Sequence, residues 1–411
     1  MTADPGAGRP TLVARPAVGS STTGPTIGLV VNPVAGLGGR VGLKGSDGTE
    51  VQQRARTLGA QPAATSRTEL MLRQFTLLAP HSTLLTAAGP MGADAARAAG
   101  LDPTVVHRPA GPGTTAADTR AAVRALVAAG AGLLLFCGGD GTARDVLDAL
   151  GTLDALGPLG TLGPEPGPPV LGIPAGVKMH SAVFAVHPRA AAEVAAAWAG
   201  GGVRLASAEV VDRDEAALRE GRVSARLHGW LTVPVLPARV QQRKTGSSTA
   251  DSEALGGIAA EVAERVGAGG LLALGPGGTT HAVATALGAA DACLTGVDVL
   301  RLQPGGTARV VIRDARADQL LALPAAPWIA LSPIGGQGFL LGRGNQQFTP
   351  ELLRAAGRER LLVLATEAKL AALAGRPLLL DTGDPELDDA LSGHVRVITG
   401  RHASAVYRLT A

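Results

Sequence analysis

The sequence predicts an α/β protein with two lobes, on three observations. At 411 residues, the chain is too long for one ordinary hydrophobic core, so two domains are expected. Hydrophobic residues make up 46% of the chain and charged residues 17%, which excludes a disordered protein. Short apolar runs alternate with alanine-rich helical stretches, which is the pattern of βαβ units around a parallel sheet.

The N-terminal lobe is predicted to be a Rossmann-like parallel-sheet lobe. Strands are expected at 27–31, 82–87, 104–107, 132–137 and 170–174. Helices are expected between and after them, at 49–58, 69–78, 115–129, 142–150 and 189–198. The stretch 222–235 has an extended β pattern, and we expect it to close this lobe.

A second α/β lobe is predicted for the C-terminal half. A helix at 258–266 and a strand at 271–274 lead into a glycine turn and another helix, and further strands are expected at 328–331, 361–365, 378–380 and 395–398. The predicted domains are therefore 26–237 and 253–411, joined by a linker or mobile loop at 238–252. Residues 1–25 lack the apolar segment of a secretory signal and are predicted to be a disordered tail.

The composition excludes several classes of partner. The chain contains no run of 18 uncharged apolar residues, so no membrane insertion is expected. Basic residues are dispersed and aromatics are only 2%, which argues against a nucleic-acid partner. Cys137 and Cys293 lie in or beside apolar runs and are expected to be reduced thiols, consistent with a cytoplasmic protein. The sequence leaves the oligomeric state open, a homo-oligomer included.

The strongest motif is the turn Gly138–Thr142, which follows the apolar run 133–137 and precedes a helix. Glycines allow positive φ angles and let the backbone approach phosphate oxygens closely. The turn contains three of them, Gly138, Gly139 and Gly141. The helix N-terminus adds unpaired N–H groups and a favourable dipole for anions. A carboxylate repels phosphate, so Asp140 needs another role, either as general base on a hydroxyl or as anchor for a magnesium ion. The alternative is an ordinary Asp-Gly turn, which the double glycine and Thr142 make the weaker interpretation.

A second glycine-rich loop follows the first predicted strand, where open parallel sheets bind ligands. Its polar and flexible members are candidates for phosphate or ribose contacts: Asn32, Gly36, Gly38, Gly39 and Arg40. The alternative is simple turn chemistry, because Asn-Pro favours turns by itself.

A third loop, 173–181, follows the predicted strand 170–174 and is expected beside the Asp140 turn at the same sheet edge. Its candidate substrate-binding residues are Lys178, His180 and Ser181, and the alternative is a solvated lysine with a packed histidine. Only four of the 37 basic residues are lysines. Lys44 and Lys178 lie inside or beside glycine-rich loops, where a compact mobile charge suits phosphate.

Two loops of the second lobe are further candidates for substrate binding. The turn 275–280 opens a helix and offers Gly277 and Thr279 for an anion. The polar loop 335–347 offers Gln337, Arg343 and Asn345 for a base or ribose. For each loop, a structural turn is an equal alternative. The eight histidines show no metal-ligand spacing, so no dedicated metal site is predicted.

These motifs resemble the NAD kinase and diacylglycerol/sphingosine kinase superfamily, and most closely an ATP-NAD kinase-like family. The resemblance rests on four stretches and runs from about residue 27 to residue 400: 36–48, 138–145, 172–181 and 335–347. It implies an N-terminal lobe of the NAD kinase/diacylglycerol kinase type, and a phosphotransferase that takes ATP with Mg²⁺. It also implies that Asp140 deprotonates the adenosine 2′-hydroxyl of NAD, giving NADP, while Gly138, Gly139, Gly141 and Thr142 line the phosphate site.

The sequence departs from the resemblance at the acceptor. NAD kinases carry an Asn-Glu pair for the adenosine, and this chain has no such dipeptide. Lipid kinases carry a different loop where this chain has 173–181. Two alternatives therefore stay open: a kinase of another hydroxyl, such as a lipid or small polyol, and a non-catalytic sensor of nucleotides or sugar phosphates.

Overall fold

The computed structural model describes residues 24–43, 49–111, 113–151, 167–177, 179–213, 225–236, 239–240 and 252–411. The predicted tail 1–25 lies outside these ranges except for its last two residues. The predicted linker 238–252 lies outside them except for 239–240 and 252. Lys44 and Lys178 also fall outside the described residues.

The described residues divide into two compact units. The first takes in those within Met1–Pro33, Ala64–Ala175 and His180–Gln241, and the second those within Val34–Ala63, Gly176–Met179 and Gln242–Ala411. Each unit is therefore discontinuous in the chain, whereas the predicted domains are continuous. The second unit includes the glycine-rich loop from Val34 onward and the short segment Gly176–Met179.

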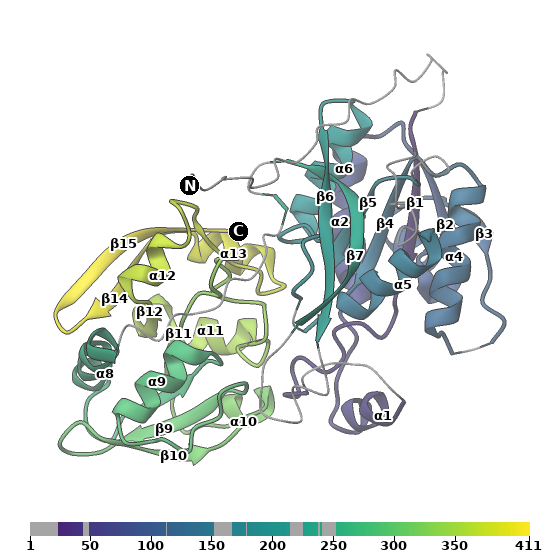
Figure 1. Ribbon diagram of the computed structural model, residues 1–411. Helices are drawn as coiled ribbons and strands as arrows, with labels where there is room; N and C mark the ends of the chain where they lie inside the picture. Colours follow the sequence, from purple (N-terminus) through teal and green to yellow (C-terminus); the bar gives the residue numbers. More distant parts are fainter. Residues whose placement is uncertain are drawn as a thin grey trace, which may run out of the picture. The chain divides into compact units, whose positions relative to one another are not determined.

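The first unit is built on a five-stranded parallel sheet in the order β3-β2-β1-β4-β5 (Figure 1). Its strands are β1 (Thr26–Val31), β2 (Thr83–Ala87), β3 (Thr104–His107), β4 (Leu133–Gly138) and β5 (Val170–Pro174). β1, β4 and β5 are buried along almost their whole length, as parallel strands covered on both faces are. The predicted parallel-sheet lobe is confirmed.

The helices of this unit divide into two packed groups. They are α2 (Ala64–Leu78), the 3₁₀ helix η1 (Gly89–Met91), α3 (Ala93–Ala98), α4 (Ala116–Ala128), α5 (Asp140–Leu150) and α6 (Pro188–Ala199). α2 packs against α3 and α6, whereas α4 packs against α5. The connections from β1 to β2 and β3 progress one way across the sheet, and those from β3 to β4 and β5 the other way. β1 and β4 therefore flank the topological switch point, where open α/β sheets bind ligands at the carboxyl ends of their strands.

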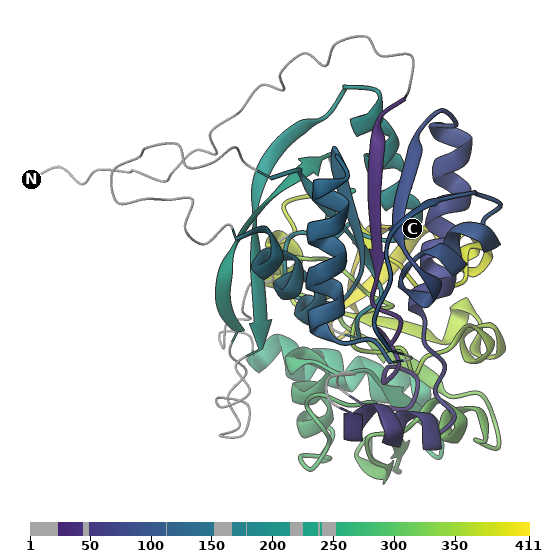
Figure 2. The same cartoon turned by 90° about the vertical axis from the view of Figure 1, so that its right-hand side faces the viewer.

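A long antiparallel pair of strands completes the first unit. β6 (Arg204–Arg213) pairs with β7 (Ala225–Val235), and the two curve together beside the sheet (Figures 1 and 2). They pack against α5 and β5. The β closing segment was predicted from residue 222 onward, and its partner strand β6 was not predicted.

The second unit contains a mixed eight-stranded sheet in the order β10-β9-β8-β11-β12-β14-β15-β13. Its strands are β8 (Leu271–Leu274), β9 (Asp298–Leu302), β10 (Ala308–Ile312), β11 (Trp328–Leu331), β12 (Leu361–Leu364), β13 (Leu378–Leu379), β14 (Gly393–Gly400) and β15 (Ala403–Thr410). β8, β11, β12 and β14 run parallel, so β8, β11 and β12 end at one edge. The second α/β lobe is confirmed.

Two large apolar clusters make most of the core of this second unit. Its helices are α1 (Thr49–Thr57), α8 (Ser252–Val266), α9 (Gly278–Ala286), α10 (Ala317–Leu321), α11 (Pro350–Ala356), the 3₁₀ helix η3 (Arg358–Arg360), α12 (Glu367–Ala371) and α13 (Pro385–Leu391). α13 begins at an N-cap, Asp384, whose Oδ1 accepts from the Leu387 N–H. Within the described ranges, no helix combines the length and apolar character needed to cross a bilayer.

Glycine makes room for aromatic packing in the core of the first unit. Phe136 and Phe184 meet edge to face with 5.3 Å between their ring centroids. A Cβ on Gly172 would lie 2.7 Å from Phe184 Cε1 and 2.9 Å from Phe136 Cζ. Residue 172 is therefore a glycine because the rings occupy the space of a side chain.

The Cys137 thiol is expected to be unreactive in the folded protein. Cys137 is fully buried, and burial raises the pKa of its thiol to about 11. Since the thiolate is the nucleophile, a Cys293→Ser variant should not react with Ellman's reagent at neutral pH until denaturant is added. Rapid reaction of the native Cys293→Ser variant would contradict the buried placement of β4.

Candidate active site

The predicted glycine turn joins β4 directly to α5. Gly138 ends the strand, Gly139 is the N-cap, and Asp140 is the first residue of the helix. The first intrahelical bond runs from the Ala143 N–H to the Gly139 carbonyl, so the three preceding N–H groups have no intrahelical acceptor. The turn does not use positive φ angles, contrary to the expectation: Gly139 has φ −123° and ψ −164°.

Gly138 is required by space instead. A Cβ at this position would lie 2.5 Å from Thr142 Cβ and would overlap the Thr142 hydroxyl. Thr142 Oγ1 accepts a hydrogen bond of 3.0 Å from Asn32 Nδ2, and the Asn32 N–H donates to the Cys137 carbonyl at 2.9 Å. The ends of β1 and β4 are thus tied together at the switch point by two predicted site residues.

A Gly138→Ala substitution is expected to displace Thr142 and lower activity by about tenfold or more, since a methyl group must occupy the space of its side chain. The matched control is Gly200→Ala at the end of α6, where φ is −76° and the nearest atom to a new Cβ lies at 3.6 Å. Steady-state kinetics of both variants test this. Equal activity of the two would contradict the close approach at Gly138.

The carboxylate of Asp140 lies against residues 180 and 181. Its Oδ2 accepts the His180 N–H at 2.8 Å, and its Oδ1 accepts the Ser181 N–H at 3.0 Å. The His180 ring also approaches, with Nδ1 3.2 Å from Oδ2. The Asp140 side chain is 6% exposed and that of His180 13%. The expectation that this loop lies beside the Asp140 turn is confirmed.

Ser181 connects its loop to β6. Its hydroxyl donates to the Val211 carbonyl at 2.9 Å and accepts the Val211 N–H at 3.1 Å, which anchors the loop to β6. The Ala182 N–H donates to the Glu209 carbonyl in the same strand. Ser181 is completely buried, so a substrate would reach it only if the loop moved. Its predicted substrate contact stays a prediction.

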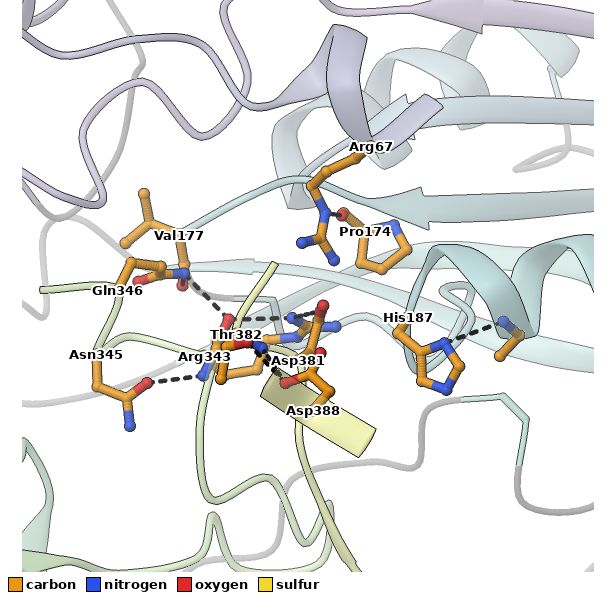
Figure 3. A network of polar contacts seen from close by, with 12 residues as sticks. Arg67, Pro174, Val177, His187, Arg343, Asn345, Gln346, Asp381, Thr382 and Asp388 are labelled. Atoms are coloured by element: carbon orange, nitrogen blue, oxygen red, sulfur yellow. Dashed lines mark hydrogen bonds and ion pairs between the residues drawn. The ribbon is translucent and has the colours of Figure 1, made fainter. Parts of the chain in front are cut away.

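Sequence reasoning missed Arg67, which lies near the same strand ends. Arg67 Nε on α2 donates to the Pro174 carbonyl at the end of β5 (Figure 3). No motif surrounds Arg67, and its helix was predicted to begin only at residue 69. Nothing in the sequence pattern therefore pointed to this guanidinium.

The glycine-rich loop after β1 is built into the second unit. Its turns are closed by backbone bonds such as Leu37 N–H to Val34 carbonyl, and Gly36 has a φ of 78°. The Arg40 carbonyl accepts the Ala317 N–H, and the Arg40 side chain forms an exposed ion pair of 3.3 Å with Glu351. The predicted phosphate or ribose contacts of Gly36, Gly38, Gly39 and Arg40 stay predictions.

The polar loop 335–347 holds the segment 176–179 within the second unit. The Val177 carbonyl accepts bonds from the Gly344 N–H at 2.8 Å and from Gln346 Nε2 at 2.7 Å (Figure 3). Gln337 Nε2 reaches the Met179 carbonyl at 3.4 Å. Gln337 is thereby used as a positioning side chain, and its predicted contact with substrate stays a prediction.

Arg343 and Asn345 also make structural contacts in this loop. Arg343 Nη1 lies 2.5 Å from Asp381 Oδ2, and both side chains are almost completely buried (Figure 3). The Arg343 guanidinium stacks on Phe339, 4.2 Å from the ring centroid. Asn345 closes the loop by accepting from the Gly342 N–H and donating to the Leu340 carbonyl, each at 2.9 Å.

The second glycine turn brings together residues that the sequence did not connect. It opens α9, with Gly277 as N-cap at φ 137°. Lys369 Nζ donates to Thr279 Oγ1 at 3.0 Å and to Ser332 Oγ at 2.8 Å, so a cation lies among the ends of β8, β11 and β12. Thr279 and Gly277 were predicted site residues. Lys369 was noticed only as one of four lysines, and Ser332 not at all.

Comparisons with known proteins bear on the family. No curated protein matches the chain. Two solved structures of a putative diacylglycerol kinase from Bacillus anthracis str. Sterne are similar at 15% and 12% identity, each with a TM-score of 0.24. They cover 46% and 62% of this chain, and this chain spans 47% and 61% of theirs. A likeness this low carries no argument.

The family profiles give a direct match. Residues 27–203 match the ATP-NAD kinase N-terminal domain, and residues 257–409 match the ATP-NAD kinase C-terminal domain. Together they cover both predicted lobes, and the resemblance inferred from the motifs is confirmed. The chain belongs to the ATP-NAD kinase family.

Proposed function

We propose that this protein transfers the γ-phosphoryl group of ATP to the adenosine 2′-hydroxyl of NAD, giving NADP. The observation that carries the proposal is the junction of β1 and β4 at the switch point, where Asn32 and Thr142 are hydrogen-bonded beside the N-terminus of α5. The membership in the ATP-NAD kinase family supports both the donor and the acceptor.

The phosphate half of the proposal follows from the start of α5. The N–H groups of Asp140, Gly141 and Thr142 belong to the first turn, where they have no intrahelical acceptor. The positive end of the helix dipole adds to their attraction for a phosphate. Catalysis of phosphoryl transfer depends mainly on such positioning and charge neutralisation.

Magnesium would enter with ATP. Two of the three carboxylates of α5 are already engaged: Asp140 accepts two backbone N–H groups, and Asp145 pairs with Arg120 at 2.7 Å. This donor set fits an ion that keeps several waters and is held mainly by phosphate oxygens. Asp140 is then the carboxylate that supports removal of the proton from the acceptor hydroxyl.

Release of ADP tests the proposal and its rivals. The wild-type protein with Mg²⁺-ATP should release ADP when NAD is added, and release should disappear in Asp140→Asn. Release with a small polyol or a lipid, and none with NAD, would assign the protein to another hydroxyl acceptor. Tight NAD binding without any ADP release would favour the non-catalytic sensor.

A further inference from the structure

We infer that the His180 imidazole takes the proton from the acceptor hydroxyl, and that Asp140 is the positioning residue that orients this ring. The inference rests on the proposed function, because it assumes a hydroxyl acceptor at the Asp140 turn. The proton-accepting atom is then His180 Nε2, whereas the family resemblance implies this role for the Asp140 carboxylate.

The Asp140 carboxylate is already occupied by contacts with residues 180 and 181. A carboxylate oxygen has two lone pairs in its plane. Oδ2 already accepts the His180 N–H at 2.8 Å and lies 3.2 Å from His180 Nδ1, and Oδ1 accepts the Ser181 N–H at 3.0 Å. With its side chain only 6% exposed, Asp140 has little room for a substrate hydroxyl. The carboxylate is arranged to hold the loop and the ring.

The contact with Asp140 determines the tautomer of His180. An ionised carboxylate accepts hydrogen bonds and donates none, so the nitrogen that faces it must carry the hydrogen. Nδ1 faces Asp140 Oδ2, which leaves Nε2 as the unprotonated nitrogen of the neutral ring. No described residue hydrogen-bonds Nε2, and the His180 side chain is more exposed than that of Asp140, at 13%. Imidazole is the commonest general base in enzymes.

The loop that carries His180 is held in place by hydrogen bonds. The Ser181 N–H donates to the Asp140 carboxylate, and the Ser181 hydroxyl bonds to the backbone of β6. The Ala182 N–H adds a bond of 3.0 Å to the Glu209 carbonyl. A general base on a supported loop keeps its geometry. In many enzymes a second residue orients the general base, as Asp140 does here for His180.

The acceptor hydroxyl gives its proton to His180 Nε2, and its oxygen forms a bond to the γ-phosphorus of ATP. The bond between the γ-phosphorus and the β,γ-bridging oxygen breaks, and ADP leaves with that electron pair. The imidazolium keeps its Nδ1–H on Asp140 and later releases the Nε2 proton to water.

Two variants of residue 180 separate catalysis from support. Asparagine in His180→Asn offers an amide N–H in place of Nδ1–H and keeps the loop, but it has no group in place of Nε2. We expect kcat to fall about 10²-fold in both His180→Asn and His180→Ala, with the KM for NAD changed little. Added imidazole should restore at least about tenfold of the loss in His180→Ala. A kcat of His180→Asn within about threefold of wild type, or a loss that imidazole does not relieve, would overturn the inference.

A spectroscopic measurement makes the test independent of the acceptor. With ¹⁵N-labelled histidine, the imidazole nitrogens of His180 are assigned by the signals lost in His180→Asn. We expect Nδ1 to be protonated and Nε2 not, and the opposite tautomer would overturn the inference. Absence of NADP in the wild-type assay would contradict the proposed function alone, because the tautomer still decides the role of Asp140.

Discussion

Replacing Asp140 with asparagine is expected to lower kcat for phosphoryl transfer by about 10³-fold. The substitution removes the charge that orients the His180 ring. It also turns an amide N–H toward one of two backbone N–H groups, those of His180 and Ser181, which now share the carboxylate. An N–H left without an acceptor costs about 1 to 3 kcal/mol. Steady-state kinetics with NAD and Mg²⁺-ATP measure the loss.

Asp145 on the same helix provides the matched control. It is 8% exposed and pairs with Arg120 at 2.7 Å, so Asp145→Asn removes another buried negative charge of α5. Burial raises the pKa of Asp145 against the opposing effect of Arg120, so burial at this position disfavours the charged form of the side chain. We expect Asp145→Asn to keep kcat within about threefold of wild type. An Asp140→Asn enzyme as active as Asp145→Asn would contradict the assignment of the site.

Breaking the buried ion pair of the second unit should cause the largest loss of stability. The side chains of Arg343 and Asp381 are 3% and 2% exposed, and their charges lie 2.5 Å apart. Asp381→Asn removes the negative partner of a buried guanidinium. Because a buried charge cannot be solvated by water, we expect the free energy of unfolding to fall by about 3 to 5 kcal/mol. Urea denaturation measures this change.

Two further variants control for the ion pair. Arg354→Met removes a pair with Asp384 in which the side chains are 48% and 25% exposed, and it should lower the free energy of unfolding by less than about 1 kcal/mol. The double variant Arg343→Met with Asp381→Asn should lose less than the sum of the single losses, because it removes both charges of the pair together. Additive losses would contradict a direct interaction.

The sequence predicted the parallel strands of both sheets well because most of them are buried runs of apolar residues. The strands at 104–107, 170–174, 271–274 and 328–331 were found at the predicted residues. β9, β10 and β15 were missed because arginines interrupt their apolar pattern: Arg301, Arg309 and Arg408. These strands lie in antiparallel pairs, whose alternating residues give a weaker signal than a buried run.

The site was predictable only where local sequence determines it. The turn Gly138–Thr142 follows from a strand, a double glycine and a helix, and all three are found in this order, with the helix beginning at Asp140, two residues before its predicted start. The use of the carboxylate was not predictable, since the contact with His180 spans 40 residues along the chain and depends on how β6 anchors Ser181. Lys369 is likewise 90 residues from Thr279, and no pattern in the sequence links them.

Mass spectrometry of the nucleotide products tests the central claim most directly. NAD incubated with Mg²⁺-ATP and the wild-type protein should be converted into NADP, with one ADP formed for each NADP, and Asp140→Asn should convert almost none. Recovery of all NAD unchanged, under conditions where the protein consumes ATP with another hydroxyl compound or binds NAD without turnover, would contradict the account.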